Sequence, residues 1–364
     1  MGKEVPPART PAQRLSYFRS RLGALGLDAY WVTGRPDVRY LSGFTGDDST
    51  LLVTPERAAL VTDSRFTEQA QEEAEVEEVF CRRAGMAHTV GLLCRQMGLG
   101  RLGFTSPHVT HADWRALGTE AGGAELIPLA RGPAEVMRER KDAGEVEAVL
   151  RALQVAQEAF KRFEAGIGPG RSEKWMAALL EWEMRRDGAE GAAFETICAL
   201  DERGSLPHAP CTDRQAGPDS PVLVDWGARV GGYNCDLTRL TATGTMPPLV
   251  SKLTQVVLEA QEAAFERLLP GVRCCEVDRA ARAVVARAGY GRNFGHGLGH
   301  GVGLEVHEGP RLGAGEESLL LPGMVVTVEP GIYLPGEAGV RIEDMVLITG
   351  EGHRVLSSLG RQPR

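Results

Sequence analysis

The sequence lacks any apolar run approaching the ~18 residues that a membrane-spanning helix needs. Its first residues also lack the hydrophobic stretch of a secretory signal. Basic residues are in deficit, because 41 Lys and Arg face 49 Asp and Glu, for a net charge of −8 with no basic patch. Such a surface repels nucleic-acid phosphates and anionic lipids. We therefore expect a cytoplasmic protein that binds neither nucleic acid nor membranes.

Cysteine patterns with a structural role are also missing. The seven cysteines are scattered, odd in number and never spaced C-x-x-C, which excludes a disulfide framework and a zinc knuckle and predicts reduced thiols. The composition, with 43% hydrophobic and 25% charged residues, is that of a folded globular chain and excludes a disordered or collagen-like one. At 364 residues the chain exceeds the ~250 to 300 residues of a single core, so two domains are expected.

Helical and strand patterns alternate over the first third of the chain, which predicts an α/β domain. A helical pattern over residues 14–25 leads into a short strand-like run over residues 27–33. This alternation breaks near residues 131–133, and a long amphipathic helix follows. We place the domain boundary there, which gives domains of residues 1–135 and 136–364.

The second domain contains an internal repeat, which is marked by the spacing of its turns and of the glycines that end its helices. A Pro-Gly turn at 169–170 recurs at 270–271, and a glycine that ends a helix recurs at Gly188 and Gly289. Both offsets are 101 residues. Two copies of helix, turn, helix and strands predict a pseudo-symmetric α+β domain with a site where its halves meet.

Two aspartates lie on a predicted hairpin around Gly231-Gly232. A two-residue turn at this position makes Asp225 face Thr238 and makes Asp225 and Asp236 diagonal neighbours on one face. An acid beside the apolar run 222–224 is costly without a partner or a cation. The pair could share a metal ion; the alternative is two ordinary turn or capping aspartates.

Three of the eight histidines, His296, His300 and His307, fall within twelve residues of a glycine-rich run. Five glycines between 295 and 303 make a helix unfavourable, so extended backbone is expected. Strand alternation then directs His296 and His300 to one side and His307 to the other, unless a bulge intervenes. The alternative is a flexible glycine-rich loop with solvated histidines.

Two further acids, Glu329 and Glu343, interrupt apolar strand-like runs. With the two aspartates and one imidazole they make a predominantly oxygen ligand set that suits Mn²⁺, Co²⁺ or Zn²⁺. Four carboxylates carry a charge of −4, which two divalent ions neutralise and one ion does not. This balance favours a dinuclear centre that activates water and polarises a carbonyl, as amide hydrolysis requires.

These residues carry a family resemblance. The runs 329–333 (Glu-Pro-Gly-Ile-Tyr) and 341–344 (Arg-Ile-Glu-Asp) resemble the pita-bread metallopeptidases, a superfamily that includes methionine aminopeptidase, aminopeptidase P and prolidase. The runs 205–208, 297–300 and 304–308 are similar to its proline-specific branch, and 40–46 and 61–70 resemble the creatinase-type N-terminal domain of short bacterial aminopeptidases P. The resemblance implies an α/β N-terminal domain and an α+β pita-bread catalytic domain with an internal pseudo-two-fold repeat.

The resemblance also implies site residues. Its five metal ligands correspond to Asp225, Asp236, His300, Glu329 and Glu343. Glu329 would also act as the base and His307 would stabilise the tetrahedral intermediate. His208 and His296 would line the substrate pocket, and Arg341 would support the ligands.

The implied function is hydrolysis of the bond between an N-terminal residue and a following proline by an Xaa-Pro aminopeptidase. Two divalent ions are expected, with Mn²⁺ ahead of Co²⁺ or Zn²⁺, and a homodimer is expected as the assembly. A prolidase restricted to Xaa-Pro dipeptides would use the same residues. A non-catalytic pseudo-peptidase or a metal-free creatinase is a further alternative, although such proteins typically lack ligands that are all present here.

Overall fold

The computed structural model describes residues 5–363, which divide into two compact units. One unit comprises residues 9–138, and the other comprises residues 139–363 together with residues 5–8. No helix in this part of the chain combines the length and the apolar character needed to cross a bilayer.

The unit of residues 9–138 is a six-stranded mixed sheet with strand order β4-β3-β2-β1-β5-β6. Its strands are β1 (Ala29–Val32), β2 (Thr50–Val53), β3 (Ala58–Thr62), β4 (Glu78–Cys81), β5 (Arg101–Thr105) and β6 (Glu125–Leu129). Its helices are α1 (Pro11–Leu22), α2 (Arg35–Ser42), α3 (Thr67–Glu73), α4 (Met86–Met97), α5 (His111–Glu120) and α6 (Pro133–Arg138). The helical pattern at 14–25 corresponds to α1 and a 3-10 turn, and the strand-like run at 27–33 contains β1.

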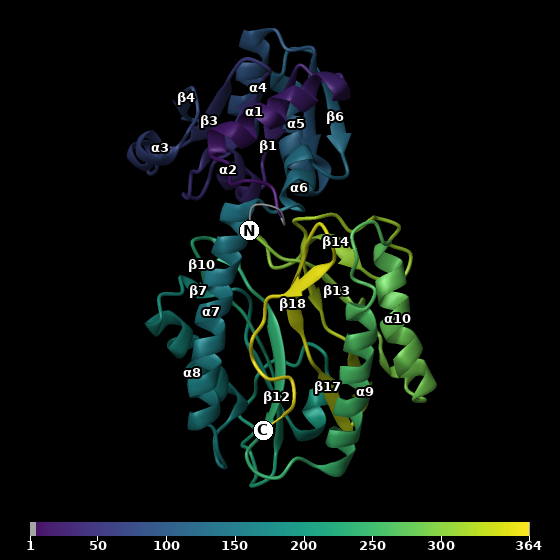
Figure 1. Ribbon diagram of the computed structural model, residues 1–364. Helices are drawn as coiled ribbons and strands as arrows, with labels where there is room; N and C mark the ends of the chain where they lie inside the picture. Colours follow the sequence, from purple (N-terminus) through teal and green to yellow (C-terminus); the bar gives the residue numbers. More distant parts are fainter. Residues whose placement is uncertain (1–4, 364) are drawn as a thin grey trace. The chain divides into compact units, whose positions relative to one another are not determined.

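The unit of residues 139–363 has two helix pairs on opposite sides of a layer of strands (Figure 1). They are α7 (Ala143–Gly166) with α8 (Glu173–Arg186), and α9 (Pro248–Phe265) with α10 (Cys274–Arg287). Both ends of α10 lie 101 residues after the corresponding ends of α8, which confirms the predicted repeat. Ser172 caps α8 by accepting a hydrogen bond from the Trp175 N–H.

The strands between these helices form four small sheets. The three-stranded sheet β12-β9-β8 belongs to the first half of the repeat, and the five-stranded sheet β14-β13-β15-β18-β19 belongs to the second. Their strands are β8 (Ile197–Leu200), β9 (Pro221–Trp226), β12 (Leu237–Ala242), β13 (Gly299–Gly301), β14 (Glu308–Leu312), β15 (Val325–Val328), β18 (Asp344–Ile348) and β19 (His353–Val355). The smaller sheets contain β7 (Gly191–Ala192), β10 (Ala228–Val230), β11 (Tyr233–Asn234), β16 (Gly331–Leu334) and β17 (Ala338–Arg341). A single bridge between Thr238 and Glu343 joins the two larger sheets.

The hairpin that carries the two aspartates has the predicted register. Gly231 and Gly232 have φ values of 56° and 74°, the positive values that a two-residue type I′ turn requires and that glycine adopts without strain. Asp225 on β9 pairs with Thr238 on β12. The turn chemistry therefore determines which face of the sheet receives the Asp225 side chain.

A close backbone contact holds the 3-10 helix at Asp201–Ser205 against β17. A Cβ atom on Gly339 would lie 1.8 Å from the Gly204 carbonyl oxygen, which no side chain can tolerate without backbone movement. Because Gly204 is followed closely by His208, this contact also positions one of the predicted pocket residues.

We expect Gly339→Ala to lower the free energy of unfolding by about 1 to 3 kcal/mol, the usual effect of overpacking. Gly168→Ala is the matched control, because a Cβ atom there meets nothing within 4 Å. Urea denaturation of the two variants measures the difference, and equal midpoints would contradict the inferred contact.

Candidate metal centre

One cavity of about 660 Å³ in the unit of residues 139–363 is lined by all nine candidate residues. Those from the first half of the repeat are His208, Asp225 and Asp236, and those from the second half are His296, His300, His307, Glu329, Arg341 and Glu343. The structure therefore brings together side chains that are up to 135 positions apart, at the place where the two halves meet.

Three overlapping groups of ligand-type side chains lie in this cavity. Asp225, Asp236 and Glu343 form one group, whose ligand atoms lie within 4.8 Å of one another. His300 and Glu329 form a second group with the same Glu343 under the same limit. Asp236, His300 and His307 form the third group under the same limit. Asp236, His300 and Glu343 each belong to two of the three groups.

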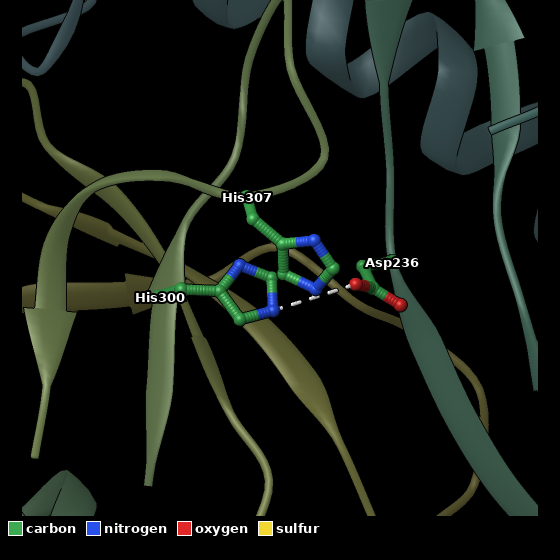
Figure 2. A group of neighbouring side chains, drawn as sticks. All are labelled: Asp236, His300 and His307. Carbon is green, nitrogen blue, oxygen red and sulfur yellow. Dashed lines mark ion pairs between the residues drawn. The ribbon is translucent and has the colours of Figure 1, made fainter. Parts of the chain in front are cut away.

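His300 of the second group also lies close to Asp236 of the first group. Its Nε2 atom lies 3.3 Å from Glu329 Oε1. The same atom lies 3.6 Å from Asp236 Oδ2 (Figure 2). The opposite ring nitrogen, Nδ1, hydrogen-bonds to the Gly301 carbonyl at 3.1 Å. A carbonyl only accepts, so Nδ1 carries a proton. Nε2 donates to Glu329 while the ring is protonated, and in the neutral ring its lone pair is available to a metal ion.

Two carboxylate oxygens of cavity-lining residues have unmet hydrogen-bonding capacity. Asp225 Oδ1 and Glu343 Oε1 are buried and have no hydrogen-bond partner among residues 5–363. Buried anionic oxygens without a donor are costly, and a divalent cation held by such oxygens removes that cost. The donor set of four carboxylates and one imidazole therefore fits hard or borderline divalent ions.

Crowding of the acids raises the affinity of the centre for protons. Burial, followed by repulsion from Asp225, raises the pKa of Asp236 well above its ordinary value. Burial and the charge of Asp236 do the same to the pKa of Glu343. Burial also raises the pKa of Asp225, although Arg341 opposes the shift. Protons and metal ions thus compete for the same oxygens.

Glu329 and His300 stabilise each other's charged forms, unlike the three crowded acids. Burial alone would raise the pKa of Glu329, but its hydrogen bond with His300 and the nearby positive charges hold that pKa below its ordinary value. Burial acts to lower the pKa of His300, but Glu329 and Asp236 raise it to about 9. Glu329 is therefore ionised at neutral pH.

Arg341 organises one wall of the cavity. Its Nη2 donates to Asp225 Oδ2 at 2.6 Å, and its Nε donates to Thr238 Oγ1 at 3.0 Å. Thr238 links Arg341 to Glu343, because the Thr238 hydroxyl donates to Glu343 Oε2 at 2.8 Å. Arg341 Nη1 also donates to the Pro207 carbonyl at 3.2 Å, next to His208.

His296 joins this network through Tyr333. Arg341 Nη1 donates to the Tyr333 hydroxyl at 2.8 Å, and that hydroxyl lies 2.9 Å from His296 Nε2. His296 Nδ1 lies 2.8 Å from the Gly297 carbonyl, so in the neutral ring Nδ1 donates and Nε2 accepts from Tyr333. Burial lowers the pKa of His296, which favours this neutral form.

His307 does not point away from His300, because the bulge named as the exception to strand alternation is present. The two rings lie with centroids 4.4 Å apart, and both face Asp236 (Figure 2). The pairing of β13 with β14 shifts register after His300, and the chain then leaves the strand, so simple alternation does not extend to residue 307. The bulge that could reverse the prediction is present.

A buried ion pair anchors the segment that carries His307. Lys141 Nζ lies 2.6 Å from Glu308 Oε1, with side chains 1% and 7% exposed. Before His307 in the chain, the Gly303 carbonyl accepts hydrogen bonds from the backbone N–H and the side-chain amide of Asn234, at 2.8 and 3.0 Å. These contacts explain why a glycine-rich segment presents His307 to the cavity.

Comparison with known proteins agrees with this geometry. Residues 147–350 match the profile of metallopeptidase family M24, and residues 14–139 match the creatinase/prolidase N-terminal domain. The chain belongs to metallopeptidase family M24. Its catalytic unit has the pita-bread fold, which confirms the predicted family and fold class.

Three relatives match this M24 protein over almost its whole length. The Xaa-Pro dipeptidase of Pyrococcus horikoshii is 35% identical over 338 residues, 92% of this chain and 94% of that protein. The structure of an Xaa-Pro dipeptidase from Bacillus anthracis has a TM-score of 0.93 at 34% identity, covering 97% of this chain and 99% of that one. The structure of an X-Pro aminopeptidase from Thermotoga maritima has a TM-score of 0.86 at 36% identity, with coverages of 94% and 99%.

Sequence reasoning did not identify four residues that shape the M24 site. Thr238 was placed opposite Asp225, and its hydroxyl could have been assigned from that register. Tyr333 lies four residues after Glu329 in the same run, and this proximity to a predicted ligand could have indicated that it belongs to the site. Lys141 and the cavity-lining Arg311 carry no local signal, because their partners are set by tertiary contacts.

Binding of divalent metal to the metal-free protein should release protons at neutral pH. His300 has a pKa of about 9 and must lose its proton to become a ligand. The raised pKa values of Asp236 and Glu343 strengthen the same competition between protons and metal. Apparent metal affinity should therefore rise with pH up to about 9. Calorimetric titration in buffers of different ionisation enthalpy measures the release.

His353→Gln is the control for this titration, because His353 binds the Leu268 carbonyl and does not line the cavity. It should release as many protons as the unaltered protein, whereas His300→Gln should release fewer. A pH-independent metal affinity would contradict the inferred competition.

Replacing Lys141 tests the anchor of the His307 segment. Breaking a buried ion pair typically costs about 3 to 5 kcal/mol, so Lys141→Met should lower the free energy of unfolding by that amount. Lys174→Met, which breaks an exposed pair with Asp213, should cost only about 0 to 1 kcal/mol. Urea denaturation measures both, and similar midpoints for the two variants would show that the pair does not anchor the fold.

Proposed function

We propose that this metallopeptidase is an Xaa-Pro dipeptidase. The observation that carries the proposal is Arg311, whose side chain lines the same cavity as the candidate metal ligands. A dipeptide ends in a free carboxylate immediately after proline, and arginine binds a carboxylate through two parallel hydrogen bonds. The likeness to proteins named Xaa-Pro dipeptidase and prolidase supports the same proposal.

The position of Arg311 suits this task. It lies on β14 and pairs with His300 across the β13–β14 ladder, so it is held next to a candidate metal ligand. Its charge also contributes to lowering the pKa of His307, after the larger effects of burial and His300. A guanidinium near both histidines can bind the substrate carboxylate while the scissile bond lies over the metal ligands.

We propose that the centre holds two divalent ions. Asp225, Asp236 and Glu343 would hold one ion, and His300 and Glu329 with the shared Glu343 would hold the other. Two ions match the −4 charge of the carboxylates. When bound, such ions supply Lewis-acid polarisation of the carbonyl and a water of lowered pKa. Manganese as the native metal and a homodimer as the assembly stay predictions.

The protein's own residues would handle protons and orientation. Glu329 is ionised at neutral pH and is therefore able to accept the proton of the attacking water. His307 would donate a hydrogen bond to the oxygen that gains negative charge, and His208, which lines the same cavity, would contact the substrate. His296, held neutral by burial, would present its ring edge to the substrate.

An Xaa-Pro aminopeptidase acting on longer peptides is the second candidate. It was the function expected from the sequence, and the likeness to the aminopeptidase of Thermotoga maritima supports it. The two activities share the metal ligands and differ in whether the chain can continue beyond proline. A non-catalytic binding role is less consistent with the site, because all five ligand-type residues are present and converge.

Comparing Xaa-Pro with Xaa-Pro-Xaa-Xaa peptides separates the two activities. We expect faster cleavage of the dipeptide, since only in the dipeptide does a free carboxylate directly follow proline, where Arg311 would bind it. Losing a hydrogen bond to a charged group costs about 1.5 to 3 kcal/mol, so Arg311→Met should raise KM for the dipeptide about ten- to a hundred-fold. The same variant should leave KM almost unchanged for the Xaa-Pro amide, whose C-terminus carries no charge.

Arg279→Met is the matched control, because Arg279 is an exposed arginine of α10 that does not line the cavity. It should behave like the unaltered protein toward both substrates. Preferential cleavage of the longer peptide would replace the dipeptidase proposal with the aminopeptidase.

A further inference from the structure

Two cysteines meet at the open edge of a strand that borders the cavity. Strand β8 is an edge strand of the sheet β12-β9-β8, so one side of its backbone has no neighbouring strand in that sheet. Cys211 covers this edge: its Sγ accepts the Cys198 N–H at 3.3 Å. The same sulfur lies 3.3 Å from the Thr196 carbonyl oxygen and 3.9 Å from that of Cys198.

A buried glutamate holds the segments around both cysteines in place. Glu173 is fully buried, and its Oε1 accepts the Leu200 N–H at 2.9 Å while its Oε2 accepts the Thr212 N–H at 2.8 Å. The same carboxylate binds the Arg203 guanidinium at 2.8 Å. The residue two positions after Cys198 and the residue directly after Cys211 are thus tied to one carboxylate, which limits how far the thiols can separate.

The two thiols differ in reactivity. A hydrogen bond from Cys198 lowers the pKa of Cys211, against the opposing effect of its partial burial. Burial raises the pKa of Cys198 well above its ordinary value. Cys211 is also the more accessible of the two. Cys211 is therefore the thiol that forms a thiolate more readily and meets a small oxidant first.

We propose that Cys198 and Cys211 are a modification site at which a peroxide introduces a disulfide bond. The Cys211 thiolate attacks one oxygen of hydrogen peroxide, which breaks the O–O bond and leaves a sulfenic acid and, after protonation, one water. The Cys198 sulfur then attacks the Cys211 sulfur and expels its hydroxyl, which leaves with the Cys198 proton as the second water. Two thiols are oxidised and one peroxide is reduced.

The disulfide would act on the wall of the cavity. Thr196 and Ile197 immediately precede Cys198, and His208, Ala209 and Pro210 immediately precede Cys211, and all five line the cavity. A covalent link would fix the His208 segment to β8 where hydrogen bonds now hold it. This modification goes beyond the proposed peptidase function and does not depend on the substrate.

Peptide mass mapping of the full-length protein tests the site. The protein is reduced, desalted, treated with hydrogen peroxide, alkylated and digested. We expect the Cys198 and Cys211 peptides to be joined with the loss of two hydrogens, and dithiothreitol should separate them. Oxidation of Cys211 to sulfinic or sulfonic acid without a joined peptide would overturn the proposal.

Three variants serve this test. Cys211→Ser keeps a hydroxyl that can make the same hydrogen bonds with the edge of β8, and Cys198→Ala removes only the second sulfur; neither should yield the joined peptide. Cys94→Ala removes a buried thiol from the unit of residues 9–138 and should yield it in full.

Hydrogen exchange supplies a readout that requires no peptidase activity. Oxidation should slow amide exchange across residues 206–212 by about ten-fold, because the link suppresses local opening of this segment. The effect should be absent in Cys198→Ala. Unchanged exchange in protein that carries the joined peptide would overturn the inferred action on the cavity wall. Both readouts remain valid if the dipeptidase proposal fails.

Discussion

The guanidinium of Arg341 is the interaction on which the rest of the site depends. It binds Asp225, Thr238, Tyr333 and the Pro207 carbonyl, and its residue is only 3% exposed. A buried arginine remains charged, so it requires partners from every side, and its planar donors fix their directions. One side chain thereby orients an aspartate on β9, a threonine on β12, the tyrosine of β16 and the backbone before His208.

The carboxylates around Arg341 create a charge problem that the polypeptide does not solve alone. Arg341 and His300 compensate part of the negative charge, and the pKa values of Asp236 and Glu343 rise because the remainder is uncompensated and buried. Stability would favour apolar residues at such positions. Four clustered acids, two buried and two half-buried, are the pattern expected where function, rather than stability, determines the residues.

The internal repeat explains how so many acids reach one place. The first half supplies Asp225 and Asp236 from the β9–β12 hairpin, and the second half supplies His300, Glu329 and Glu343 from the strands that follow α10. The bridge between Thr238 and Glu343 lies where the halves join. Each half contributes an incomplete set of ligands, so the centre exists only when both halves are packed together.

The sequence by itself determined the features that depend on a few neighbouring residues. Gly231-Gly232 set the hairpin register, and the repeated glycines set the ends of α8 and α10, because turn and cap geometry are local properties of the backbone. The family motifs identified the ligand-type acids for the same reason. Only the tertiary structure decided the direction of His307, the link from Tyr333 to His296, and the neighbours of Arg311. Lys141 and Glu308 are 167 positions apart, and Arg341 and Asp225 are 116 apart. Contacts over such separations arise from packing of the whole unit, which no local pattern encodes.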